Sequence, residues 1–464
     1  MLGHHEDDHA ETVMMRLASG HGSRGMLGVR LCTDIPECWG IHGVHRSGSL
    51  GANFKMIKHQ QERAQEPRLK LQALGNSVPE RLEFERGGVL VLRPLINFSK
   101  KRLADTCRAN AVDWEEDRTN REPWRTPRNA VRELFQSSKL PVALRKDSML
   151  ALSERNRENI DSQRAIANNM LNQCHISVFD TRSGKLVVRL PNLALSEDAA
   201  CSHTYKTSLR ASTAFLLRQL AYRVSPQEHI AFGSMEPAVM SIYPELFDSD
   251  ISENPMYQPT GFTVGGVHFE RLSWPLSQHQ TEPRPSNFKT PIPGTEGLNP
   301  NFAWRLSRQP FSDQVPFIPI PPPNRNPSLL SKSDSRPTDT YPMSNSSLWS
   351  PWHLWDGRYW IRVLNRSAQH LVVRPLQRSD LRLIEATIGG DRYKALRELL
   401  AVAAPKKIRW TLPAIARVDD PQPSLSRVLT MPTLGPGGHL DIKDENGHKR
   451  VAWQIRYKNT TLSS

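Results

Sequence analysis

The chain opens on Gly3-His4-His5-Glu6-Asp7-Asp8-His9-Ala10-Glu11-Thr12-Val13-Met14-Met15-Arg16. This stretch packs three histidines and four carboxylates into about three helical turns, a density that solvation of a surface does not require. In a helix, His4, Asp8, Glu11 and Met15 lie on one side, because residues three and four apart share a face. Acidic residues suit a first helical turn and glycines follow the stretch, so the sequence predicts a helix over residues 5–18.

The residue types of this helix leave two interpretations open. A polar N-terminal turn is stable in water without any further role, since carboxylates near a helix N-terminus are favourable on their own. Histidine and carboxylate pairs at helical spacing also suit a metal or catalytic site. Composition favours neither interpretation, and we assign no metal ligands from it.

The literal string resembles the second signature motif of the tRNA(Ile)-lysidine synthases, which are PP-loop (N-type) ATP pyrophosphatases. The resemblance rests on the pattern Gly-His-His-x-Asp-Asp-x-x-Glu-Thr-x-x-x-Arg-Leu from Gly3 to Leu17. Three further segments resemble the family in the expected order: Leu92-Arg93-Pro94-Leu95, Trp114-Glu115-Glu116-Asp117-x-Thr119-Asn120 and Arg128-Asn129-x-x-Arg132. The ordered set of four indicates the family more strongly than any one of them.

The resemblance implies an α/β fold: a partial Rossmann-like PP-loop ATPase domain, followed by a helical domain and a small α+β C-terminal domain. The family's Ser-Gly-Gly-x-Asp-Ser loop, whose backbone N–H groups hold ATP phosphates, does not occur in these 464 residues. The Gly-Gly pairs at 87–88, 265–266, 389–390 and 437–438 neither follow Ser nor precede Asp-Ser. We therefore expect an N-terminally truncated member that lacks the phosphate loop.

Four regions are predicted along the chain. Residues 1–147 form the partial PP-loop domain, and residues 148–274 form a helical, tRNA-positioning domain with strands. Residues 275–349 form a Pro-rich disordered insert or linker, because 16 of the 36 prolines lie between 275 and 351 and such a composition cannot bury a core. Residues 350–464 form an α+β C-terminal domain.

Local patterns predict the elements within these regions. The apolar run at 87–95, bounded by Gly and Pro, predicts a strand buried on both faces. Ser99 is expected to cap a helix that ends near Asn110. Helices are expected over 144–174, 209–223 and 393–403, a hairpin over 176–190, and strands over 262–269, 359–363, 408–415 and 428–432.

Composition narrows the class of partner. The formal net charge of +14 and the pI near 9.7 favour a polyanion such as RNA, with a merely basic solvated surface as the alternative. The five cysteines form no Cys-x-x-Cys pair, so neither a zinc ribbon nor an iron–sulfur cluster is expected. A tRNA 2-thiolation enzyme is disfavoured for the same reason. No apolar run approaches the roughly 20 residues of a membrane span, and we expect a mitochondrial or cytoplasmic location.

The resemblance implies a tRNA-modifying ligase. Such an enzyme uses ATP and Mg²⁺ to join free L-lysine to C2 of the cytidine at the first anticodon position of tRNA(Ile), forming lysidine and releasing AMP and pyrophosphate. The expected partners are tRNA(Ile) and free L-lysine. No membrane partner is expected, and the resemblance leaves a homodimer open. The alternative is a non-catalytic tRNA-binding remnant that has lost ATP binding.

Roles for individual residues also follow from the resemblance. Asp8 and Glu11 are the expected ligands of the lysine ammonium, since a cation requires carboxylates. ATP contacts are assigned to His4, Arg93 and Arg132, because arginine's planar fork suits phosphate charge. The expected catalytic set is His5, Asp7, Asp8, Glu11, Arg128 and Arg132.

Structural alternatives stand beside several of these roles. Arg93 and Glu116 are equally well explained as an ion pair between the strand and the next loop. Asn120 and Asn129 are alternatively turn and cap residues. The aromatic residues of the C-terminal region are expected in its core more than on RNA bases.

Overall fold

A computed structural model describes residues 1–44, 82–85, 88–115, 119, 122–137, 139–193, 203–247, 260–273, 302–312, 315–322, 349–367, 369–418, 427–438, 440 and 451–458. Short 3-10 helices lie at Gly25–Leu27, Pro36–Cys38, Val142–Leu144, Gly233–Met235, Pro244–Leu246, Lys406–Thr411 and Pro432–Gly438. Within these ranges, no helix combines the length and the apolar character that crossing a membrane requires.

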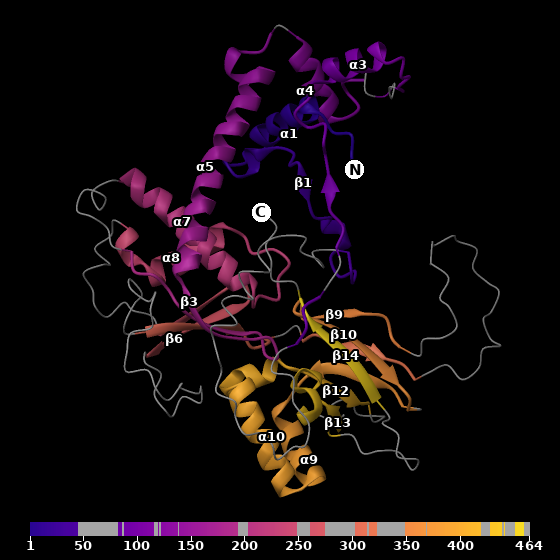
Figure 1. Ribbon diagram of the computed structural model, residues 1–464, viewed down its shortest axis with the longest axis vertical. Helices are drawn as coiled ribbons and strands as arrows, with labels where there is room; N and C mark the ends of the chain where they lie inside the picture. The colour runs from indigo at the N-terminus through magenta and orange to yellow at the C-terminus, as the bar shows by residue number, and fades with distance from the viewer. Residues whose placement is uncertain are drawn as a thin grey trace, which may run out of the picture.

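The described elements form an elongated molecule with helices at both ends (Figure 1). One end holds α1 (Glu6–Ala18), α3 (Lys100–Ala109) and α4 (Pro127–Gln136). The opposite end holds α9 (Arg378–Ile388) and α10 (Gly390–Ala403). The predicted helices over 5–18, from Ser99 to Asn110 and over 393–403 are confirmed by α1, α3 and α10.

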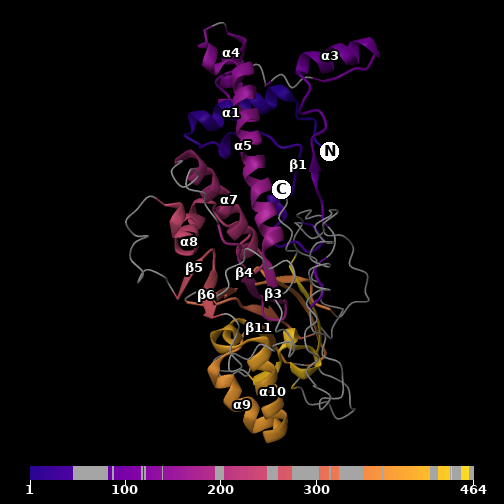
Figure 2. The ribbon, with the colours of Figure 1, turned by 60° about the vertical axis from the view of Figure 1, so that its left-hand side comes forward.

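Helix α5 (Lys146–Gln173) connects the α1 end to the rest of the molecule (Figure 2). Its 28 residues give a length of about 42 Å at 1.5 Å per residue. One stripe of α5 is buried, and it includes Met149, Ser153, Ile160, Ala167 and Met170. This stripe packs first on α1 and then on α7 (His203–Tyr222), and α8 (Glu236–Ile242) packs on α7 in turn. The predictions over 144–174 and 209–223 are thus confirmed.

Below α5 and α7 lies a five-stranded antiparallel sheet. Its order is β3 (His175–Asp180), β4 (Lys185–Arg189), β7 (Phe302–Arg308), β6 (Val267–Ser273) and β5 (Gly261–Val264). The predicted hairpin over 176–190 is β3–β4, and the predicted strand pair over 262–269 is β5–β6.

Strand β7 lies in the middle of this sheet, inside the range 275–349 that we predicted as a disordered insert. Its residues Ala303, Trp304 and Leu306 are buried, and it pairs with both β4 and β6. A second strand from the same range, β8 (Ile318–Ile320), pairs with β11. The prediction is wrong for these two segments, because proline-rich flanks dominate the composition of the window while the apolar residues decide its packing.

Two smaller sheets follow. The four-stranded sheet has the order β13 (Arg427–Thr430), β12 (Pro413–Arg417), β11 (Leu371–Pro375) and β8. The predicted strand over 428–432 corresponds to β13. The strand predicted over 408–415 is wrong in its first half, where a 3-10 helix, Lys406–Thr411, precedes β12.

The three-stranded sheet has the order β14 (Val451–Tyr457), β10 (Tyr359–Asn365) and β9 (His353–Trp355). Strand β10 contains the predicted strand over 359–363. The aromatic prediction for this region also holds at two positions, since Trp355 and Trp360 are buried.

A single hydrophobic core joins the middle of the molecule to its lower part. It contains side chains from α5, α7, the five-stranded sheet, β8, β11 and the three-stranded sheet, among them Leu217, Val188, Leu306, Tyr359 and Tyr457. The regions 148–274 and 350–464 therefore share buried contacts. A second core lies between α9, α10 and β12.

Among the described residues, the N-terminal segment contacts the lower part of the molecule around His42 and around Phe84. The His42 ring stacks on Trp352 with 4.5 Å between ring centroids. Phe84 forms a parallel bridge with Tyr457, and the Tyr457 N–H donates to the Glu83 carbonyl over 2.7 Å. The segment around Phe84 thus pairs with the end of β14.

The segment predicted as a strand buried on both faces, residues 87–95, differs in the structure. Within its described part, residues 88–95, only Val91–Leu92 is a strand, β2, and it pairs antiparallel with β1 (Cys32–Thr33). Val89 is 46% exposed and Leu92 is 42% exposed. The prediction of burial is wrong because this two-stranded ladder has no other sheet neighbour within the described residues.

Candidate functional site

Helix α1 is fixed at its first turn and along its inner face. The His5 N–H donates to Asp8 Oδ2 over 3.0 Å, which satisfies one of the backbone donors at the helix start. Val13 and Met14 are buried against Met149 of α5. This small core turns the polar face of α1 toward α4 and toward the start of α5.

Glu11 and Arg132 form the central pair of the site. Arg132 Nε donates to Glu11 Oε1 over 2.8 Å, and Arg132 Nη2 donates to Glu11 Oε2 over 3.1 Å. Glu11 is 1% exposed, so both of its oxygens are committed inside the protein. This bidentate pair ties α4 to α1 and occupies both Glu11 oxygens, while the contact of Glu11 with lysine stays a prediction.

Arg128 lies one turn before Arg132 on α4 and reaches the same carboxylates less closely. Its Nη1 is 3.8 Å from Asp8 Oδ1, and its Nε is 3.8 Å from Glu11 Oε2. Its Nη2 donates to Thr12 Oγ1 over 3.2 Å, and its side chain is 38% exposed. Arg128 and Asp8, both predicted site residues, therefore carry opposite charges that face each other at the boundary with solvent.

Asp7 takes part in a second network, which joins α1 to α3 and α5. Its Oδ2 accepts from the Lys100 N–H over 2.7 Å, and its Oδ1 accepts from Lys146 Nζ over 2.7 Å. Lys146 also lies 2.7 Å from Glu6. Burial opposes the charge of Asp7, but the hydrogen bonds from Lys146 and Lys100 outweigh it and lower the pKa of Asp7.

Lys146 is a site residue that the sequence did not single out. Burial alone would lower its pKa, but the hydrogen bonds to Asp7 and Glu6 raise it above the ordinary value. Its place as the first residue of α5 was the available signal, because a lysine at a helix N-terminus opposes the helix dipole and needs a carboxylate partner.

The two histidines before α1 face the carboxylates. His5 Nδ1 is 3.5 Å from Asp7 Oδ2 and 3.4 Å from Asp8 Oδ2. Within the described part of the chain, Nδ1 of His4 and Nδ1 of His5 are buried without a hydrogen-bond partner. Buried polar atoms of this kind need a partner, and a polar ligand beside Asp8 would supply one.

Arg93 makes its hydrogen bonds away from this site. Its Nη1 donates to the Arg30 carbonyl over 3.1 Å and to Thr33 Oγ1 over 3.0 Å, so it ties β2 to β1. Glu116, its alternative partner, and Asn120 lie outside the described residues. Asn129 has the alternative turn role, since its side chain donates to the Thr119 and Glu122 carbonyls.

His9 has a structural role on the inner face of α1. Its Nε2 lies 3.0 Å from Ser153 Oγ on α5, and its Nδ1 accepts from the Val29 N–H over 3.1 Å. Burial, followed by the charge of Arg157, lowers the pKa of His9. A Cβ on Gly28 would lie 2.5 Å from His9 Cε1, so this close approach requires glycine.

The cationic and anionic groups fit one part of an ATP-dependent site. Arg128 suits a phosphate oxygen and Asp8 suits an ammonium group. The N-terminus of α1 is capped by its own Asp8, and the described residues supply no glycine-rich phosphate cradle in its place. They also contain no group of three or more His, Cys, Asp and Glu side chains arranged to hold a metal ion. They do not form a complete ATP and Mg²⁺ site.

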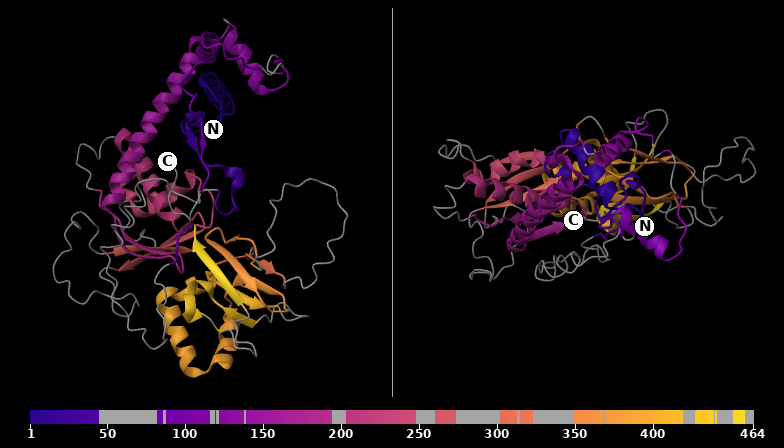
Figure 3. Two further views of the ribbon diagram at one scale, coloured as in Figure 1. Left: turned by 45° about the vertical axis from the view of Figure 1, so that its right-hand side comes forward. Right: turned by 90° about the horizontal axis from the view of Figure 1, so that it is seen from above.

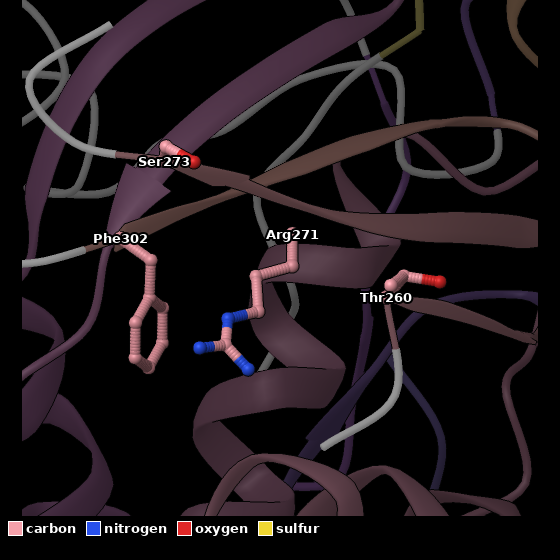
Figure 4. A pocket seen from close by; sticks show the side chains of 4 residues that line it. All are labelled: Thr260, Arg271, Ser273 and Phe302. Carbon is pink, nitrogen blue, oxygen red and sulfur yellow. The ribbon is translucent and has the colours of Figure 1, made fainter. Parts of the chain in front are cut away.

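A small pocket lies elsewhere, on the five-stranded sheet (Figure 4). Its volume is about 210 Å³, and its lining residues are Thr260, Arg271, Ser273 and Phe302. The Arg271 guanidinium lies 4.3 Å from the centre of the Phe302 ring. No residue predicted for the site lines this pocket.

The chain is similar to known proteins in one segment and over nearly its whole length. Residues 60–138 match a sequence family described as a PP-loop domain, which includes α3, α4 and both arginines of the site. The chain is 21% identical over 449 residues to the protein named "Probable tRNA(Ile)-lysidine synthase" of Schizosaccharomyces pombe, a match that spans 96% of this chain and 71% of that protein. The mixture of helices and sheets fits the predicted α/β class. Both similarities support the resemblance of this chain to the PP-loop tRNA(Ile)-lysidine synthases.

Proposed function

We propose that this protein takes part in tRNA modification as an ATP-using ligase, which joins L-lysine to C2 of the cytidine at the first anticodon position of tRNA(Ile). The observation that carries the proposal is the meeting of Asp8 with Arg128 and His5 at a solvent boundary, 3.8 Å and 3.4 Å apart respectively. The match to a PP-loop domain supports the use of ATP, commonly with Mg²⁺. The named relative supports tRNA as the substrate.

Each side chain of the site has a role in this proposal. Asp8, 14% exposed, binds the ammonium group of lysine. Arg128 contacts a phosphate group of ATP and stabilises the negative charge that develops there, because the guanidinium presents several N–H donors. His5 accepts the proton that the attacking amine releases, because its imidazole lies 3.4 Å from Asp8, the residue that binds lysine.

Glu11 and Asp7 act through other residues. The Glu11–Arg132 pair holds α4 against α1 and so fixes the position of Arg128. Asp7 fixes the starts of α3 and α5 through Lys100 and Lys146. ATP adenylates the oxygen on C2 of the cytidine and releases pyrophosphate. The lysine amine then forms the C2–nitrogen bond, and the C2–oxygen bond breaks as AMP leaves with that oxygen.

The direct test is release of AMP in the presence of lysine and tRNA(Ile). AMP release that requires both substrates supports the proposal, together with incorporation of labelled lysine into the tRNA. Binding of tRNA(Ile) without any AMP release would contradict it. That outcome would support the second candidate, a non-catalytic tRNA-binding protein, which is favoured by the incomplete phosphate site of the described residues.

A narrower prediction concerns the carboxylate of Asp8. Asp8→Asn should raise the KM for lysine by about 10- to 100-fold, the loss expected for one charge-assisted hydrogen bond, and leave tRNA affinity nearly unchanged. Steady-state kinetics at varied lysine, with tRNA binding measured separately, checks it. Equal loss of lysine and tRNA binding in Asp8→Asn would indicate a folding role instead.

A further inference from the structure

The first turn of α1 carries three consecutive acidic residues, Glu6, Asp7 and Asp8. The side chains of Glu6 and Asp7 are 29% and 31% exposed, so both are within reach of a molecule dissolved in water. Asp7 Oδ2 and Asp8 Oδ2 lie 3.5 Å and 3.4 Å from the same atom, His5 Nδ1. A free ammonium group would therefore find adjacent carboxylates of the same chemistry at this turn.

Two of these three carboxylates already bind an ammonium group, that of Lys146. Its Nζ lies 2.7 Å from Glu6 Oε1 and donates to Asp7 Oδ1 over 2.7 Å. Lys146 is the first residue of α5, which runs from the α1 and α4 end to the five-stranded sheet (Figure 3). Met149, three residues later, is buried against Val13 of α1. The packing of α5 on α1 thus fixes where this ammonium group lies.

The third carboxylate, that of Asp8, has a different charged neighbour. Arg128 Nη1 lies 3.8 Å from Asp8 Oδ1, a longer contact than those of Lys146. The Lys146 side chain ends in the same group as free lysine and is 26% exposed. If Lys146 were absent, Glu6 and Asp7 would offer free lysine two carboxylate ligands and would compete with Asp8 for it. The contact of Lys146 therefore bears on where a substrate lysine can bind.

We propose that Lys146 is a specificity-determining residue: it fills the ammonium place at Glu6 and Asp7 and so restricts the ammonium group of free lysine to Asp8. This inference rests on the proposed function, because that function supplies lysine as a substrate. Lys146 contacts no substrate in this role and acts through the two carboxylates that it binds. Without it, lysine binds at the wrong carboxylates and does not react.

The first test needs no catalytic activity and uses hydrogen exchange at the amides of α1. Lys146→Ala removes three carbons and the ammonium group, which are the atoms of n-propylammonium. Lys146→Met removes the charge but keeps most of the volume. Lys139→Ala is the matched control, because Lys139 is an exposed lysine between α4 and α5. Each protein is measured with n-propylammonium chloride and with sodium chloride at the same concentration.

Exchange in α1 should be faster in both Lys146 variants than in the wild type, since two carboxylates lose their counterion. At ten times its Kd for the vacated place, n-propylammonium should slow exchange in Lys146→Ala by about 10-fold more than in the other three proteins. A ligand that binds only the folded form raises protection by the factor 1 + [L]/Kd. Binding at Asp8 is common to all four proteins, so the comparison removes it.

The second test measures AMP release at varied lysine in the presence of tRNA(Ile). In Lys146→Ala, kcat and the KM for lysine should both fall by the same factor, about 3-fold or more, because lysine bound at Glu6 and Asp7 withdraws enzyme without reacting. Lys146→Arg should restore both constants toward the wild type, since its guanidinium can pair with the two carboxylates. Lys139→Ala should keep the wild-type values.

The results that would overturn the inference are distinguishable from failure of the proposed function. Equal slowing of exchange by n-propylammonium in Lys146→Ala and in the wild type would overturn the inference alone. A lower kcat at an unchanged KM for lysine would assign Lys146 a purely structural role, with the same consequence. Absence of lysine-dependent AMP release by the wild-type protein would overturn the proposed function, and the inference with it.

Discussion

Two charged clusters of this molecule differ in how completely they are paired. Deep in the lower part, Arg358 is fully buried and donates to Asp356 over 2.8 Å, to the Ser183 carbonyl over 3.1 Å and to the Thr411 carbonyl over 2.6 Å. At the α1 end, Arg128 is 38% exposed and stays 3.8 Å from its carboxylates. The first cluster is saturated by the protein, and the second retains capacity for a ligand.

The two charged clusters also differ in the size of the hydrophobic core beside them. Arg358 lies beside the large core that contains Tyr359 and Tyr457, whereas the core cluster at the α1 end has Val13, Met14 and Met149 as its buried members among the described residues. In the large core, a buried arginine with all these hydrogen bonds made can link several elements. A small core leaves local stability to polar pairs, so the same pairs that prepare the site also hold it together.

The largest loss of stability is expected at Gly357, which lies between Asp356 and Arg358 of the saturated cluster. In Gly357→Ala, the new Cβ would lie 1.8 Å from the Pro226 carbonyl oxygen at a residue with φ of +58°. We expect a loss of about 4 kcal/mol or more in the free energy of unfolding, measured by chemical denaturation. Gly389→Ala is the control, since its φ of +80° is similar but nothing lies within 4 Å; it should lose about 1 kcal/mol. Equal losses in the two variants would contradict the role of the Pro226 contact.

A smaller and more local effect is expected at the α1 end. Glu11→Gln keeps the shape of the side chain but leaves Arg132 without its bidentate partner, which should cost about 3 kcal/mol, the lower end for breaking a buried pair, since Arg132 is 26% exposed. Hydrogen exchange should accelerate at the amides of α1 and α4 and not in the five-stranded sheet. Uniform acceleration across both regions would show that the two clusters are not energetically separate.

The smallest effect concerns pH and His9. Its pKa in the folded protein is lowered by burial and by Arg157, so below about pH 6.5, the ordinary histidine value, the unfolded chain binds more protons than the folded one. The α1 end should therefore lose stability as pH falls through 6.5. His9→Asn should weaken this dependence in α1 hydrogen exchange relative to the wild type. A steeper loss of stability in the variant would contradict the assignment.

Elements with strong local signals are predictable from the sequence. The acidic first turn and the following glycines identify α1, and Ser99 caps α3 as expected, its side chain accepting from the Arg102 N–H. Helix α9 is absent from the prediction although Leu381, Ile384 and Ile388 recur at helical spacing. Strand β7 is absent as well, because its partners come from distant parts of the chain and its flanks are rich in proline.

The site is predictable as a set of residues and less so as a set of contacts. The spacing of Asp8 and Glu11 places them on one face, and the motif at Arg128 and Arg132 places both arginines opposite. Which carboxylate is buried depends on α5, whose packing brings Lys146 and the small core to α1. Such contacts between distant residues have no local signal, which is also why the position of Arg93 is not predictable.

The hydrogen bonds between Tyr457 and the segment around Phe84 have a consequence for synthesis of the protein. A ribosome delivers the N-terminal residues first, yet Glu83 and Glu85 find their backbone partner only in the last strand of the described chain. The three-stranded sheet and its connection to the N-terminal segment therefore close only after β14 has been synthesised. Until then the nascent chain exposes strand edges, which is the condition under which chaperones are needed.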